Sequence, residues 1–156
     1  CRSPRTTAVA LGEFCAALGY RAVSFEALGP QGQPAYHTNV MMAIGEDFAI
    51  VCADAIPDAG RRRAVLEELE GAGHEIIAID VAEMNGFAGN LLALRSHRGE
   101  PLIAGSEAAF RALAPDNRRA LERHGMLVSA AIPTIERLGG GSVRCMIAEI
   151  FLPRSG

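Results

Sequence analysis

Residues 38–53 read TNVMMAIGEDFAIVCA, and this stretch defines the first structural unit of the chain. Two short apolar runs flank Gly45-Glu46-Asp47, which is a plausible hairpin turn. A stretch with helical periodicity and another short apolar run follow. The pattern therefore predicts a ββαβ unit with strands at Thr38–Ile44 and Phe48–Ala53, a helix at Asp58–Ala72 and a closing strand at Ile76–Ile79.

The same order of elements recurs farther along the chain. The second unit is predicted to have strands at Leu91–Leu94 and Leu102–Ala104, a helical stretch at Glu107–His124 interrupted near Pro115, and a closing strand at Met126–Ala130. The unit starts Tyr36, Asn90 and Arg144 are evenly spaced, because 90 − 36 and 144 − 90 both equal 54. Repeats of this length are typical of modules that bury their faces against one another.

Parts of further modules flank these two units. We expect a helix at Thr6–Gly19, a strand at Arg21–Ala27, a turn cluster at Gly29–Pro34 and a final strand at Val143–Phe151. The chain is thus predicted to be one domain divided at about 1–35 (partial), 36–89, 90–143 and 144–156 (partial). Because it begins at Cys1 without an initiator Met, we expect a truncated or processed product.

Composition excludes several classes of function. The formal net charge of −3 gives no electrostatic signature of binding to nucleic acid or acidic membranes. The four cysteines show no CxxC pair or metal-ligand spacing, and no signal peptide or apolar run of membrane-spanning length is present, so we expect free thiols in the cytoplasm. The motifs of P-loop, dinucleotide-binding, HExxH and GxSxG proteins are also missing.

Cys145 is the candidate nucleophile. It follows Gly139-Gly140-Gly141, where three residues without side chains suit the close passage of a ligand past the backbone. Arg144 adds positive charge that would stabilise a thiolate if its guanidinium points that way. The alternative is a cysteine buried in a strand after a flexible loop, because a lone cysteine more often packs than reacts.

The repeat suggests which residues join Cys145. His37 and Asn90 lie, like Cys145, within about one residue of the start of a module's first strand, and equivalent positions of a radial repeat converge. His37 could exchange protons near neutral pH, or simply hydrogen-bond a turn carbonyl. Gly89-Asn90 could equally form an ordinary turn. The remaining histidines are expected to be solvated, and the facing of Glu149 stays open.

Three motifs together resemble the C-terminal half of the pentein (arginine deiminase/amidinotransferase) superfamily, closest to its citrulline-hydrolase branch. They are His37-Thr38-Asn39, Phe87-Ala88-Gly89-Asn90 and the run from Gly139 to Met146. The resemblance implies an α/β-propeller of five ββαβ modules, about half of which is present, with the site on the ring axis. It also implies Cys145 as nucleophile, His37 as acid/base, and substrate binding by Asn39, Asn90, Gly141 and Arg144.

One departure from the family pattern bears on the substrate. Arginine deiminases carry His-x-Asp, whereas this chain has Asn39 in place of the aspartate, and an amide cannot compensate a full positive charge. The resemblance therefore implies a cysteine-dependent C–N hydrolase that converts citrulline to ornithine, ammonia and carbon dioxide, with no metal or organic cofactor. The alternatives are an arginine deiminase, an amidinotransferase, or a non-catalytic half-ring that only associates with a partner. The family's other substrate-binding acids come from the first half of the ring, so we expect a homo-oligomer or a missing N-terminal half.

Overall fold

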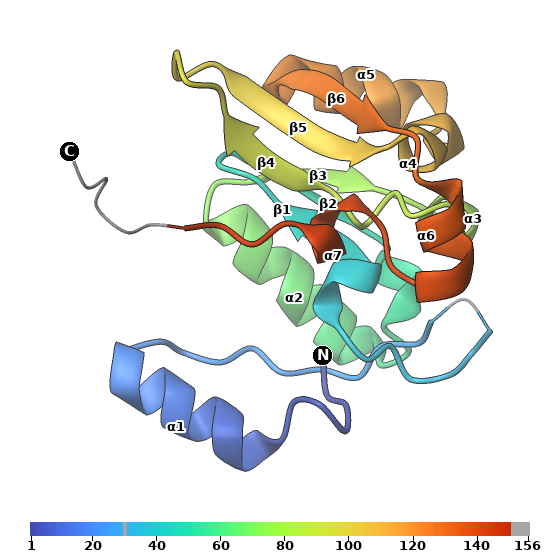
Figure 1. The fold of residues 1–156 in the computed structure, drawn as a ribbon. Helices are drawn as coiled ribbons and strands as arrows, with labels where there is room; N and C mark the ends of the chain where they lie inside the picture. Colours follow the sequence, from blue (N-terminus) through green and yellow to red (C-terminus); the bar gives the residue numbers. More distant parts are fainter. Residues whose placement is uncertain (30, 151–156) are drawn as a thin grey trace.

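Two three-stranded sheets with the same strand order form the body of the chain (Figure 1). The structure, a computed structural model, describes residues 1–29 and 31–150. The first sheet has β1 (Met42–Ile44) antiparallel to β2 (Phe48–Val51), and β2 parallel to β3 (Glu75–Ala78). The second repeats this arrangement with β4 (Leu92–Arg95), β5 (Pro101–Ser106) and β6 (Met126–Ala130). The predicted ββαβ repeat is therefore confirmed.

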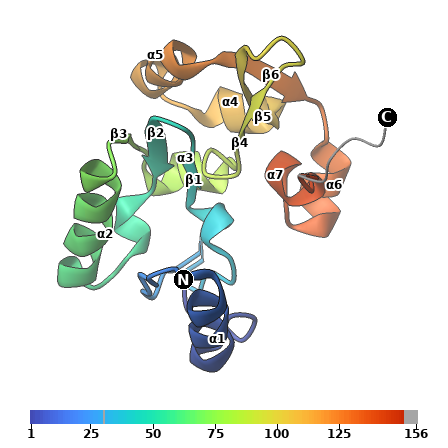
Figure 2. The ribbon, with the colours of Figure 1, turned by 90° about the vertical axis from the view of Figure 1, so that its left-hand side faces the viewer.

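Helices connect the parallel strands of each sheet and lie on the outside of the molecule (Figure 2). In the first module the connection is η2 (Ala53–Ala55) and α2 (Ala59–Gly71); in the second it is α4 (Glu107–Ala112) and α5 (Pro115–His124). The predicted interruption at Pro115 is confirmed: Pro115 opens α5, and the residue before a proline is driven out of the helical region. In α2, the Asp58 side chain accepts a hydrogen bond from the Arg61 amide at 2.6 Å, while Val65 and Leu69 are buried.

The core follows from the apolar runs of the sequence. Every residue of β2 is buried, and the buried cluster continues through both modules. Its largest fully buried apolar side chains, each under 2% exposed, are Met41, Ile50, Ile56, Leu91, Ile103 and Leu121. Burying such side chains contributes about 1.5–3 kcal/mol each before conformational entropy is subtracted. The core therefore holds the two modules together and keeps β1 beside β4 (Figure 2).

Charged side chains of opposite sign also meet between the modules. Glu46 pairs with Arg95, and Glu75 pairs with Arg123. The imidazole of His124 lies between Asp47 and Glu75, with nitrogen–oxygen distances of 2.9 and 3.0 Å. The prediction that His124 is solvated is wrong, since its side chain is only 8% exposed.

Two predicted strands are absent from the described residues. Residues 21–27 form no strand, and their backbone bonds go to loops, as from the Arg2 amide to the Phe25 carbonyl at 2.8 Å. The segment predicted as the strand Val143–Phe151 instead forms α7 (Val143–Met146) and then irregular backbone, with Phe151 outside the described residues. The physical reason is the same in both cases, because a strand needs a hydrogen-bonded neighbour and neither segment has one here.

Several short helices complete the fold. Residues 38–40, predicted as strand, form the 3-10 helix η1 (Thr38–Val40), and α3 (Val81–Asn85) and α6 (Pro133–Gly139) were not predicted. The predicted N-terminal helix is confirmed as α1 (Ala8–Leu18), which ends at Gly19 with a φ of 71°. It buries no residue and lies apart from both sheets (Figures 1 and 2). Across the described part of the chain, every helix is too short or too polar to cross a membrane.

Candidate active site

Cys145 lies in α7, directly after the glycine-rich turn that follows α6. Its side chain is exposed and forms no disulfide. Gly140 is in the left-handed region with a φ of 68°, which glycine adopts without strain. A Cβ atom at Gly141 would lie 3.1 Å from the Cβ and 3.2 Å from the Sγ of Cys145. The glycines therefore turn the chain and leave room around the thiol.

Two side-chain amides converge on the Cys145 sulfur. Asn90 donates from Nδ2 to Sγ at 3.2 Å, and Asn39 donates from its own Nδ2 at 3.6 Å. Asn90 also donates to the backbone carbonyl of Asn39 at 2.8 Å. This bond connects the segment just before β4 to η1. Donors to sulfur favour the thiolate over the thiol, so this arrangement can prepare Cys145 for nucleophilic attack.

The carbonyl oxygens of the same amides are buried and have no hydrogen-bond partner among the described residues. Asn90 as a whole is only 3% exposed. A buried acceptor without a partner costs about 1–3 kcal/mol. Asn39 and Asn90 can therefore each offer a carbonyl oxygen to an N–H group of a bound ligand.

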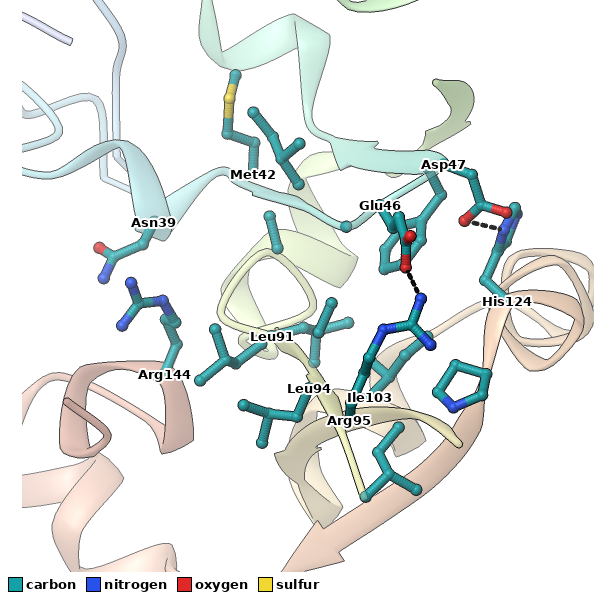
Figure 3. A pocket seen from close by; sticks show the side chains of 18 of the residues that line it. Asn39, Met42, Glu46, Asp47, Leu91, Leu94, Arg95, Ile103, His124 and Arg144 are labelled. Atoms are coloured by element: carbon teal, nitrogen blue, oxygen red, sulfur yellow. Dashed lines mark hydrogen bonds and ion pairs between the residues drawn. The ribbon is translucent and has the colours of Figure 1, made fainter. Parts of the chain in front are cut away.

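A pocket of about 1060 Å³ lies beside the thiol, between β1 and β4. Figure 3 shows Asn39 facing Arg144 at one end and the Glu46–Arg95 and Asp47–His124 pairs at the other. The wall between the two ends is apolar, and includes Met42, Leu91, Leu94 and Ile103. Cys145 itself does not line the pocket, but its sulfur accepts a hydrogen bond from Asn39, which does.

His37 occupies the position before η1, two residues from Asn39. Its side chain is exposed, and its ring meets the Tyr36 ring edge-on with centroids 4.9 Å apart. Tyr36 in turn donates from its hydroxyl to the Gly140 carbonyl at 3.3 Å, so the histidine segment touches the glycine turn. The His37 imidazole has no hydrogen bond to Cys145 or to another described residue. The structure thus brings Asn39, Asn90, Gly141 and Cys145 together, with His37 two residues from Asn39 and without a hydrogen bond to the group.

Comparison with known proteins identifies the family. Residues 1–152 match the family described as N,N dimethylarginine dimethylhydrolase, eukaryotic. The chain belongs to this family. It is accordingly a member of the pentein superfamily, as the motifs around His37, Asn90 and Cys145 predicted. No curated protein gave a match.

Solved structures support the pentein fold. The chain resembles apo ArgZ, an arginine dihydrolase from the ornithine-ammonia cycle in cyanobacteria, with a TM-score of 0.71 and 13% identity. It also resembles the product-bound N-terminal domain of ArgZ, with a TM-score of 0.64 and 16% identity. The similarity covers 98% and 90% of this chain, but only 23% and 46% of those chains. This pentein chain therefore spans less than half of either relative, and the predicted α/β-propeller fold is confirmed.

Sequence reasoning missed two contacts of this pentein site. One is the bond from Asn39 to the Cys145 sulfur, since Asn39 was predicted only to bind substrate. The other is the bond from the Ser142 hydroxyl to Glu136, for which a serine directly after three glycines was the one available signal. In residues 1–29 and 31–150, no three His, Cys, Asp or Glu side chains are grouped to hold a metal ion.

Proposed function

We propose that this chain carries the nucleophilic half of a cysteine-dependent C–N hydrolase for ureido or guanidino amino acids, with citrulline as substrate. The observation that carries the proposal is the pair of amides, Asn39 and Asn90, that donate to the Cys145 sulfur beside a pocket. An isolated structural cysteine has no need of two such donors. The arrangement fits an activated nucleophile.

The reaction would proceed in two steps. Cys145 Sγ bonds to the carbon of the ureido group, the bond from that carbon to one amine nitrogen breaks, and His37 protonates the leaving nitrogen. Water, deprotonated by His37, then attacks the same carbon and releases the Cys145 thiolate. The remaining carbamate loses carbon dioxide, so the products are ornithine, ammonia and carbon dioxide. His37 is exposed and makes no hydrogen bond with Cys145, but catalytic contacts in empty sites often tighten only on binding.

The side chains around the Cys145 sulfur favour a substrate whose reacting group is neutral. The residues that touch the sulfur are amides, and the Arg144 guanidinium faces Asn39 at the same end of the pocket (Figure 3). A guanidinium bound there would be repelled by Arg144 and would lack a carboxylate partner at Asn39, whereas a ureido group carries no charge. Arg144 and Glu149, which also line the pocket, suit the carboxylate and ammonium groups of an amino acid.

A cationic substrate is the second candidate. The family description names dimethylarginine, and the structural relatives are named arginine dihydrolases. An arginine deiminase or amidinotransferase would use the same nucleophile and histidine. In that case Glu149 of the pocket, or carboxylates outside this chain, would have to compensate the charge of the guanidinium, against the nearby Arg144.

We further propose that the complete site needs additional modules, from the rest of a longer polypeptide or from a second copy. The chain spans 46% of the ArgZ N-terminal domain. Exposed apolar side chains such as Leu138, at 76%, and Met126, at 64%, are consistent with surfaces covered in a larger assembly. Four free cysteines favour a reducing compartment, and the cytoplasm remains our prediction.

The test is turnover by the complete protein with citrulline, arginine and dimethylarginine as competing substrates. Ornithine and ammonia should form from citrulline with the highest kcat/KM, and acid quenching should trap an adduct on the Cys145 peptide. Turnover of arginine or dimethylarginine without any turnover of citrulline would replace this proposal by the second candidate. Full activity of Cys145→Ala would refute both.

A further inference from the structure

The turn between α6 and α7 contacts the backbone of Cys145. The Cys145 amide donates to the Ser142 carbonyl at 3.0 Å. Only two residues separate Ser142 from Cys145, so the position of Ser142 constrains the backbone that carries the thiol. A contact that holds Ser142 in place therefore also helps to position the nucleophile.

Ser142 does not act as an ordinary helix cap. It occupies the N-cap position of α7, where a serine side chain usually accepts a hydrogen bond from a backbone amide of the first turn. Here it makes no such bond; its hydroxyl donates to Glu136 Oε1 at 2.7 Å. Ser142 is fully buried, and a hydrogen bond to a carboxylate is stronger than one between neutral groups.

Glu136 holds the other end of the turn as well. Its backbone carbonyl accepts a hydrogen bond from the Gly140 amide at 3.3 Å. One residue of α6 thus contacts both Gly140 and Ser142, the two neighbours of Gly141. A turn of glycines gains its fixed shape from such contacts, because glycine loses the most conformational freedom on folding.

We propose that Glu136 is a positioning residue that, through Ser142, holds the Cys145 sulfur within reach of the Asn39 and Asn90 amides. This inference rests on the nucleophilic role proposed above for Cys145. The competing explanation is that Glu136 only stabilises α6, since it lies in the first turn of that helix, where a negative charge is favourable.

The experiment measures how fast iodoacetamide modifies Cys145 in the complete folded protein, with peptide mass spectrometry separating the Cys145 and Cys52 peptides. The variants are Glu136→Ala, Glu136→Gln, Ser142→Ala and the double Ala variant. Gln keeps an oxygen that accepts from the Ser142 hydroxyl but loses the charge. Arg137→Ala is the matched control, because Arg137 is an exposed neighbour on α6. The buried Cys52 reports unfolding in every sample.

Loss of the contact should slow Cys145 modification about fivefold in either Ala variant, because the sulfur then drifts from the donors that favour its thiolate. Glu136→Gln and Arg137→Ala should stay within about twofold of the unaltered chain. The double variant should be no slower than either single Ala variant, as expected for two residues acting through one contact. If Cys52 becomes reactive in Ser142→Ala, that variant has partly unfolded. The comparison of Glu136→Ala with Glu136→Gln then tests the inference without it.

Three results would overturn the inference: unchanged or faster modification in Glu136→Ala, equal loss in the Gln and Ala variants, or additive losses in the double variant. An equal loss of reactivity in the Gln and Ala variants would indicate that Glu136 acts only through its negative charge in the first turn of α6. Turnover is not measured, so failure here is distinct from failure of the proposed hydrolase activity.

Discussion

The substitution Asn90→Asp puts a carboxylate where the structure has an amide donor, 3.2 Å from the Cys145 sulfur. Asp matches Asn in shape, so the buried site, with Asn90 only 3% exposed, can accept it without a cavity. What changes is charge, because a donor that favours the thiolate becomes an anion that opposes it. The variant therefore tests whether the side chain at this position acts electrostatically on the nucleophile.

The expected effect can be estimated from the geometry. A lost hydrogen bond to a charged group costs about 1.5–3 kcal/mol, which is tenfold to a hundredfold in rate. Two like charges at this separation repel by about 5 kcal/mol at an effective dielectric constant of 20. Protonation of the new carboxyl relieves part of that repulsion. We therefore expect Asn90→Asp to react at least about tenfold more slowly than Asn90→Ala, which loses only the donor.

The assay is the rate of Cys145 modification by iodoacetamide at neutral pH, followed by turnover in the complete protein. Asn85→Asp serves as the control, since Asn85 is an exposed residue at the end of α3 and adds the same charge. Thermal unfolding of each variant separates reactivity from loss of structure. If Asn90→Asp reacts as fast as Asn90→Ala, the electrostatic role is refuted.

Four further predictions concern the thiols and the substrate. Cys145→Ala should abolish citrulline turnover in the complete protein while the thermal midpoint changes little, because Cys145 is exposed; an unaltered rate would contradict the assignment. Asn39→Asp should shift the kcat/KM ratio from citrulline toward arginine, and an unchanged ratio would show that Asn39 does not sense the charge. Burial raises the pKa of the Cys52 thiol, so native Cys52 should resist iodoacetamide at pH 9 while unfolded Cys52 reacts. Because the folded state holds this proton more tightly, Cys52 should lower the free energy of unfolding as pH rises above about 8.5, which urea unfolding of a Cys52→Ala comparison can check.

The sequence predicted the parts of the fold that depend on local pattern. The apolar runs on both sides of the turn at Gly45-Glu46-Asp47 identified the β1–β2 hairpin, and helical periodicity identified α2. The 54-residue spacing also predicted that residues near the module starts converge, and Asn90 does meet Cys145. A local signal and a repeat were sufficient in these cases.

Features that depend on distant neighbours were not predictable in this way. Residues 143–150 have an apolar pattern that suits a strand, yet whether a strand forms depends on an adjacent strand supplied from elsewhere. His124 looked like a solvated helix end, because nothing local shows that Asp47 and Glu75 lie against it. The same holds for Ser142 and Glu136, whose contact arises from the path of the turn between two unpredicted helices.

The ion pairs between the two modules are asymmetric. The first module supplies only acids, Glu46, Asp47 and Glu75, and the second supplies only bases, Arg95, Arg123 and His124. The side chains of the two arginine pairs are 43–75% exposed, so each pair adds at most about 1 kcal/mol and is screened by salt. Opposite charges nevertheless favour the observed arrangement over one in which acid would face acid. The pairs therefore add a small electrostatic preference for the correct order of modules to the contacts between their apolar surfaces.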